Sequence, residues 1–157
     1  MIDIDFDIRT AKASFDGENF MPMLVITGTN GQVTMCALAV DDPAGYLAPV
    51  LAKQITESGP IESVSFTSDV FYATDDSVPR PLDRAFAAGD PRVTEALTVT
   101  RVSRGTDPEV AIVPYLRAAG GITWGETRML NEEGATLSGR VIDALRASLG
   151  QYKGENQ

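Results

Sequence analysis

The sequence predicts an α+β fold, in which a mostly antiparallel mixed sheet carries its helices on one face. Three observations lead to this class. Apolar and polar side chains alternate with a period of two in several short segments, turn dipeptides such as Asn-Gly and Gly-Gly separate them, and two longer segments carry apolar side chains at helical spacing. The expected order of elements is βββ-α-β-(α)-βββ-α, because hairpins followed by a helix bury their apolar sides when the helix packs on one face of a sheet.

The first expected strand covers residues 2–9, in which isoleucine and phenylalanine alternate with Asp3, Asp5 and Asp7. Strict alternation is typical of a half-buried strand, so the apolar side chains should face a core while the carboxylates share the other face. That carboxylate face has two interpretations: a metal or cation site, or a negatively charged surface that opposes aggregation at a sheet edge.

Two apolar segments at 21–28 and 32–40 should form a hairpin, because Asn30-Gly31 between them tolerates the positive φ angles of a tight turn. The second segment contains Cys36, which we expect in the core rather than as a reactive thiol. The side chains expected to supply core packing here are Val25, Ile26, Val33, Met35 and Leu38.

A helix is expected over residues 43–58, where apolar side chains recur at helical spacing between an Asp-Pro start signal and a Gly-Pro stop signal. Pro49 indicates either a kink in this helix or a true start near Leu47 after a preceding turn. An alternating strand over 62–73 follows the helix.

The segment 74–92 is rich in proline and aspartate and is the least regular part of the chain, with a short helix expected at 82–88. A connection of this length is uncommon in a compact domain, so it is either functional or a surface excursion without a role.

Three further strands are expected at 97–104, 109–118 and 121–129. Pro114 cannot donate a hydrogen bond within a sheet, which indicates an edge position or a bulge. A final helix at 135–149 completes a single domain over residues 1–150, and residues 151–157 are expected to form a frayed tail.

The composition excludes several kinds of catalytic site. The 157-residue chain contains no histidine and a single cysteine, so Ser-His-Asp and Cys-His systems, histidine general bases and the usual zinc sites cannot be built from it. The formal net charge of −9 disfavours binding to nucleic-acid phosphates and to anionic membranes. It permits a basic protein partner, or a divalent ion held among acids.

We expect a cytoplasmic protein. No apolar segment of the sequence approaches the length that spans a bilayer, and the first residues carry acids where a secretion signal carries Lys or Arg.

Asp5, Asp7 and Asp69 are the candidate ligands for a divalent metal, magnesium or manganese, because these ions prefer carboxylate oxygens. Carboxylates on a first strand and on the strand after the first helix resemble the ribonuclease H-like arrangement, which also begins with three antiparallel strands and a helix. The resemblance covers at most residues 2–73 and implies a metal-dependent phosphoesterase or nuclease. The acid that this arrangement places on the helix has no well-placed counterpart, since the helix offers only Glu57 near its far end.

Four arginines of the C-terminal hairpins form either a basic patch for an anionic ligand or internal ion pairs with Glu109 and Glu126 across the strands. The acidity of the chain favours internal pairing. The four are Arg101, Arg104, Arg117 and Arg128.

Because the sequence offers no coherent set of catalytic residues, we expect a non-enzymatic protein that has no cofactor. We expect this protein to bind the basic surface of another protein. Its contacts are expected on the 74–92 connection and at the single tryptophan, which alternatively completes the core. These residues are Asp75, Asp76, Arg80, Asp83, Arg84 and Trp124. The alternatives are the metal-dependent enzyme and a structural subunit of a larger assembly, in which the chain self-associates.

Overall fold

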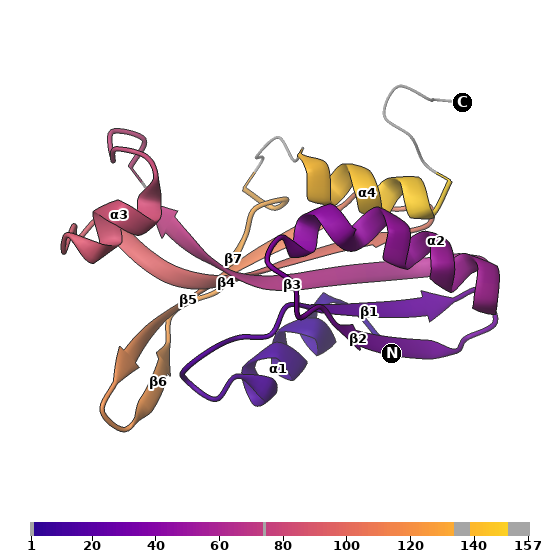
Figure 1. Cartoon of the computed structure of the whole chain (residues 1–157), viewed down its shortest axis with the longest axis horizontal. Helices are drawn as coiled ribbons and strands as arrows, with labels where there is room; N and C mark the ends of the chain where they lie inside the picture. The colour runs from indigo at the N-terminus through magenta and orange to yellow at the C-terminus, as the bar shows by residue number, and fades with distance from the viewer. Residues whose placement is uncertain (1, 74, 134–138, 151–157) are drawn as a thin grey trace.

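The computed structural model describes residues 2–73, 75–133 and 139–150, which form an α+β fold on one antiparallel sheet (Figure 1). Within these residues the sheet has seven strands in the order β2-β1-β3-β4-β5-β6, and β7 pairs with another part of β5. The elements in chain order are α1 (Ile4–Ser14), β1 (Met23–Gly28), β2 (Val33–Ala37), the 3₁₀ turn η1 (Pro43–Tyr46), α2 (Leu47–Ser58), β3 (Ile61–Ala73), α3 (Leu82–Ala87), β4 (Val93–Ser103), β5 (Glu109–Ala118), β6 (Gly121–Trp124), β7 (Arg128–Met129) and α4 (Arg140–Ser148). The predicted fold class is confirmed.

The chain begins with a helix, so the strand predicted over residues 2–9 is wrong. The carboxylate of Asp3 caps the amino end of α1 by accepting a hydrogen bond from the Phe6 backbone N–H at 2.9 Å. The first apolar residues fit both the period of two of a strand and the spacing of a helix, because Ile4 and Ile8 are four residues apart as well as part of the alternation. Ala11 continues the helical series and is buried, which places one side of the helix against the sheet.

The hairpin predicted at Asn30-Gly31 joins β1 to β2, and Gly31 adopts the positive φ of 87° that the turn requires. Two of the residues predicted to supply core, Val33 and Met35, are instead 42% and 51% exposed. β2 is the last strand at its side of the sheet, and only one of its faces is covered.

The proline conflict in the first long helix is resolved by a helix start at Leu47, one of the two outcomes that the sequence allows. η1 precedes this start, and Pro49 falls in the first turn of α2, where its missing N–H leaves no intrahelical bond unmade. Leu47 and Leu51 point into the core.

Pro114 lies at an interruption, as the sequence indicates. The predicted strand over 121–129 divides into β6 and β7, which pair with β5 on either side of this proline. The Pro114 carbonyl still accepts a hydrogen bond from the Gly125 N–H at 2.8 Å, and the missing proline donor falls in the gap between the two short strands.

The sheet separates two apolar cores. α2 and α4 lie side by side on one face, as the predicted placement of helices on one face requires (Figure 1), where Leu51 and Leu145 pack over Val64 and Val102. α1, which the sequence did not predict, packs against β3, β4 and β5 from the opposite face. The second core consists of Ile4, Ile8, Ala11, Phe15, Phe20, Leu97, Val99, Ala111, Val113 and Tyr115.

In the described residues, no helix is long and apolar enough to cross a membrane.

Candidate functional site

The three aspartates at the start of the chain do not share a surface, because they lie on a helix. Asp3 caps α1, Asp5 is exposed, and Asp7 is buried against the sheet. Helical geometry turns each of these side chains in its own direction, whereas a strand would align them. The negatively charged strand face expected from the alternation is therefore absent from these residues.

Asp7 forms a buried ion pair with Arg101 of β4. The two side chains are 0% and 4% exposed, and Arg101 Nη1 donates to Asp7 Oδ2 at 3.0 Å. The other guanidinium nitrogen, Nη2, donates to the Ser63 hydroxyl at 2.7 Å and to the Ile2 carbonyl at 2.9 Å. One arginine thus ties the amino end of α1 to two strands of the sheet.

Burial raises the pKa of Asp7 above its ordinary value, and the positive charge of Arg101 opposes this rise. Glu109 stands opposite Arg101 on β5, and its pKa is also raised, first by burial and then by the nearby charges of Asp3, Asp5 and Asp7. The positive charge of Arg101 therefore lies close to several carboxylates at once. Its contacts explain how the helix is held on the sheet.

The structure does not bring the three candidate metal ligands together. Asp69 is exposed on β3, four residues beyond Ser65, whose partner in the sheet is Arg101. Four residues of strand span roughly 13 Å, which separates Asp69 from the Asp7–Arg101 pair. In the part of the chain that the structure describes, no group of three or more Cys, Asp or Glu side chains is placed to hold a metal ion.

The C-terminal arginines are used internally, although their partners differ from those predicted. Arg117 pairs with Glu95 at 2.9 Å and also donates to the Glu18 carbonyl, while Arg128 pairs with Glu133. Arg104 donates to the backbone carbonyls of Ile61 and Leu149. These side chains join loops and helices to the sheet, as Arg101 does.

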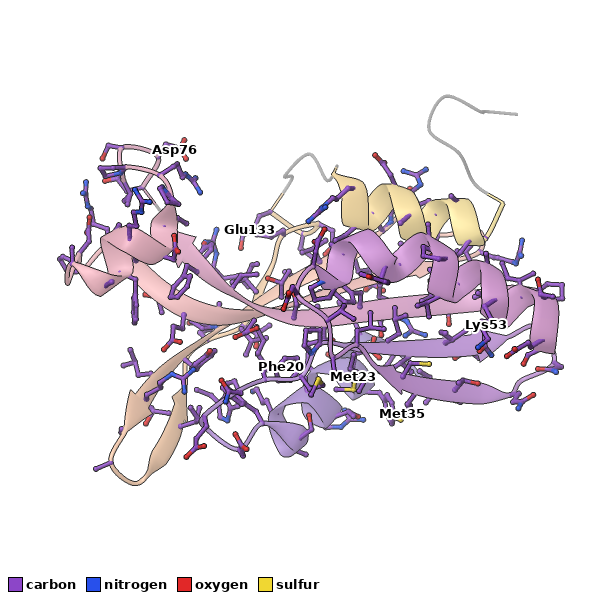
Figure 2. All side chains as sticks on the ribbon, in the orientation of Figure 1. Phe20, Met23, Met35, Lys53, Asp76 and Glu133 are labelled. Carbon is purple, nitrogen blue, oxygen red and sulfur yellow. The ribbon has the colours of Figure 1, made fainter. Side chains whose placement is uncertain are left out.

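The predicted partner-binding residues of the 74–92 connection lie on an arm that projects from the sheet, with α3 at its centre (Figure 1). We call described residues 75–92 the α3 arm. Its five predicted contacts are exposed, and Figure 2 shows Asp76 near the tip. They are Asp75, Asp76, Arg80, Asp83 and Arg84.

Three contacts order the arm. Phe86 of α3 packs on Phe71 of β3 with ring centres 5.1 Å apart. Arg92 pairs with Asp90 at 2.8 Å and donates to the Ser77 hydroxyl at 3.0 Å. An open hollow of about 660 Å³ lies beside α3, and Arg80, Arg84 and Arg92 are among the residues that line it.

Trp124 is half-buried and packs into the second core. Its ring contacts Phe15 and Tyr115, with ring centres 6.1 Å and 5.8 Å away, and the Lys12 ammonium lies 5.4 Å from its centre. These contacts correspond to the core role that the sequence allowed for the tryptophan. Its role as a partner anchor stays a prediction.

The sequence did not point to an exposed apolar surface that lies along β2. We define the open-edge patch as Met21, Val33, Met35 and Ala37. Met21 is 50% exposed, and Val33 and Met35 are exposed to similar degrees. Met23 of β1 lies opposite Ala37 and near Met35 (Figure 2). The signal in the sequence was the lack of alternation in residues 33–38, which leaves apolar side chains on both faces of a strand with only one face covered.

No family model, no curated protein and no solved structure matches this chain.

Proposed function

We propose that this protein acts without catalysis, by binding another protein that presents a basic surface. The observation that carries the proposal is the internal use of arginine. Five arginines form ion pairs within the described residues, and Arg104 binds backbone carbonyls. The five are Arg92, Arg101, Arg117, Arg128 and Arg140.

Acidic side chains outnumber basic ones by 22 to 13, and many exposed acids remain after this internal pairing. Such an excess produces a negative potential that attracts a positively charged partner and raises the association rate. The α3 arm adds a projecting segment on which three exposed acids, Asp75, Asp76 and Asp83, lie among exposed arginines. The Ser77 hydroxyl and backbone N–H donate to Asp75 and lower its pKa, which keeps that carboxylate charged in mildly acidic solution.

The test compares two triple variants that change the net charge by the same amount. The arm variant is Asp75→Asn, Asp76→Asn, Asp83→Asn, and the control variant neutralises exposed acids elsewhere as Asp107→Asn, Glu126→Gln, Glu132→Gln. The probes are an array of immobilised lysine-rich peptides and a matched array in which glutamate replaces lysine.

Wild type should bind the lysine array, with an affinity that falls as salt rises. The arm variant should bind more weakly and with less salt dependence than the control variant. Equal binding of wild type to the lysine and glutamate arrays would contradict the proposal. Equal binding by both variants would exclude the arm as the charged contact.

A further inference from the structure

We propose that the outer edge of β2 is a docking site for an extended segment of the partner protein, which adds a strand to the sheet. The inference rests on the proposed function, because the partner is taken to be basic. The site is the open-edge patch together with the backbone of β2, and the occupant is a segment with apolar side chains at alternate positions and Lys or Arg at its amino end.

The backbone of β2 directs its hydrogen-bonding groups to β1 and to the outer edge at alternate residues. The Leu38 N–H donates to the Pro22 carbonyl at 2.8 Å, and the Gly28 N–H donates to the Gln32 carbonyl at 2.8 Å. In an antiparallel pair, backbone groups point toward the partner strand at every second residue. Even-numbered residues of β2 therefore bond to β1.

The odd-numbered residues of β2 are Val33, Met35 and Ala37, and their N–H and C=O groups point away from the sheet. The same three residues carry exposed side chains on the face that α2 and α4 do not cover. An incoming strand thus finds, at the same positions, apolar side chains and backbone groups that bond to no other described residue. This combination is the one that strand addition uses, with the backbone supplying affinity and the side chains selectivity.

The five residues of β2 carry none of the usual features that protect an edge against strand pairing. Exposed edges are commonly blocked by charged side chains, proline or a bulge, whereas β2 reads Val-Thr-Met-Cys-Ala and pairs with β1 without a break in register. Methionine adds an adaptable surface, because its flexible thioether fits partners of different shape. Met23 and Met35 lie on neighbouring strands here, and the exposed Met21 precedes β1.

Charge defines the orientation of the occupant. The exposed acids Asp41 and Asp42 follow Val40 at the carboxyl side of β2, whereas the turn before β2 is neutral. Asp42 pairs with Arg140 at 2.7 Å, so Asp41 is the acid that an incoming cation would meet. Every strand pair in the described sheet is antiparallel, and an antiparallel addition brings the amino end of the incoming segment to Asp41. Basic residues at that end of the segment are favoured.

A partner segment fits this edge better than a second copy of the chain. β2 has five residues, whereas a stable interface between folded proteins uses about 20–30 residues on each side. Two copies would also each bring a net charge of −9 to the contact. An extended segment is free of two-fold symmetry, so it can follow the edge.

The experiment uses a fluorescent probe peptide, Lys-Lys-Val-Thr-Val-Thr-Val, with N-methyl groups along one edge to prevent its self-assembly. Three matched peptides serve as controls: one with glutamate in place of lysine, one with the lysines at the carboxyl end, and one methylated on both edges. Anisotropy gives the affinity for wild type and for three variants, Met35→Pro, Met35→Lys and Leu116→Lys.

Met35→Pro removes only an outward N–H and leaves the hydrogen bonds to β1 in place, so the hairpin should keep its fold. Met35→Lys blocks the same edge with a charge and serves if the proline variant does not fold. Leu116→Lys is the matched control, because Leu116 is also an exposed apolar residue on a strand, 64% exposed on β5.

Wild type should bind the probe more tightly than each control peptide. Both Met35 variants should bind it at least about tenfold more weakly, since proline or a charged lysine in the middle of β2 opposes strand pairing at this edge, and Leu116→Lys should match wild type. Unchanged binding by both folded Met35 variants would overturn the docking site while leaving a basic partner intact.

Two further outcomes separate the inference from the proposed function. Equal affinity for the lysine and glutamate peptides, with binding still lost in the Met35 variants, would overturn the basic partner and support the edge. A wild-type dimer in sedimentation that Met35→Pro dissociates would overturn the partner segment, because the edge would then belong to a second copy.

Discussion

Replacing Arg101 by methionine tests how α1 is held on the sheet. The variant keeps Asp7 in place with a fully buried carboxylate and removes its ion partner, and it also removes the donor to Ser63 and Ile2. Breaking a buried pair in this way costs about 3–5 kcal/mol of unfolding free energy, because a charge stays buried without compensation. With a urea m-value of about 2 kcal/mol per M, the unfolding midpoint should fall by about 2 M.

The double variant Asp7→Leu, Arg101→Met provides the decisive comparison. It removes both charges, so it should recover most of the loss, since an apolar replacement of a buried ion pair is often neutral or better. Lys53→Met is the control, because Lys53 and Glu57 form an exposed pair at 3.9 Å that should contribute less than about 0.5 kcal/mol. Circular dichroism during urea unfolding measures all four proteins.

The unfolding free energy should depend on pH through Asp7. Burial raises the pKa of Asp7 above 3.8, so the stability that protonated Asp7 contributes is fully present below that pH and is lost as pH rises through the raised pKa. Arg101→Met removes the charge that lowers this pKa, so its destabilisation should be larger at about pH 7 than at about pH 4. A loss below about 1 kcal/mol at pH 7, or no recovery in the double variant, would refute the reasoning.

Three other measurements test separate parts of the structure. Asp3→Ala should reduce stability by about 1 kcal/mol through loss of the helix cap, and an unchanged urea midpoint would argue against α1 starting there. Burial, with help from the charge of Glu95, raises the pKa of Tyr115 to about 12. Ultraviolet titration should therefore show one tyrosine that ionises well above pH 10, and the unfolding free energy should fall as this tyrosine ionises. If all four tyrosines titrated together, this burial would be contradicted. Leu145→Ala should lower the free energy of unfolding, measured by heat or urea, by about 2–5 kcal/mol, since the Leu145 side chain is fully buried between α4 and the sheet. A loss as small as that of a surface substitution would contradict the packing of α4 on the core.

Most of the sheet could be predicted from the sequence because its strands carry local signals. The Asn30-Gly31 turn, the alternation in the strand that became β3, and the conflict at Pro49 each depend on neighbouring residues only. The strand predicted at the start of the chain was wrong because Ile4 and Ile8 fit both a strand and a helix. The Asp3 cap and the buried Ala11 decide between them, and the alternation of aspartates was the stronger local pattern.

The candidate site was harder to predict because it depends on which face of the sheet is covered. Asp7 and Arg101 are 94 residues apart in the chain, and no local pattern relates them. Val33 and Met35 look like core residues in the sequence, and only the position of β2 at the end of the strand order exposes them. The exposed acids of the α3 arm, by contrast, follow directly from a long segment rich in aspartate and proline.

Amide hydrogen exchange on β2 tests the central claim, that this protein binds its partner by adding a strand at the open edge. In the free protein, the Thr34 and Cys36 amides should exchange slowly because they bond to β1, while Val33, Met35 and Ala37 exchange fast. Adding the lysine-ended probe should protect those three amides and remove the alternation. Protection confined to the α3 arm, or no change along β2 at saturating probe, would contradict the claim.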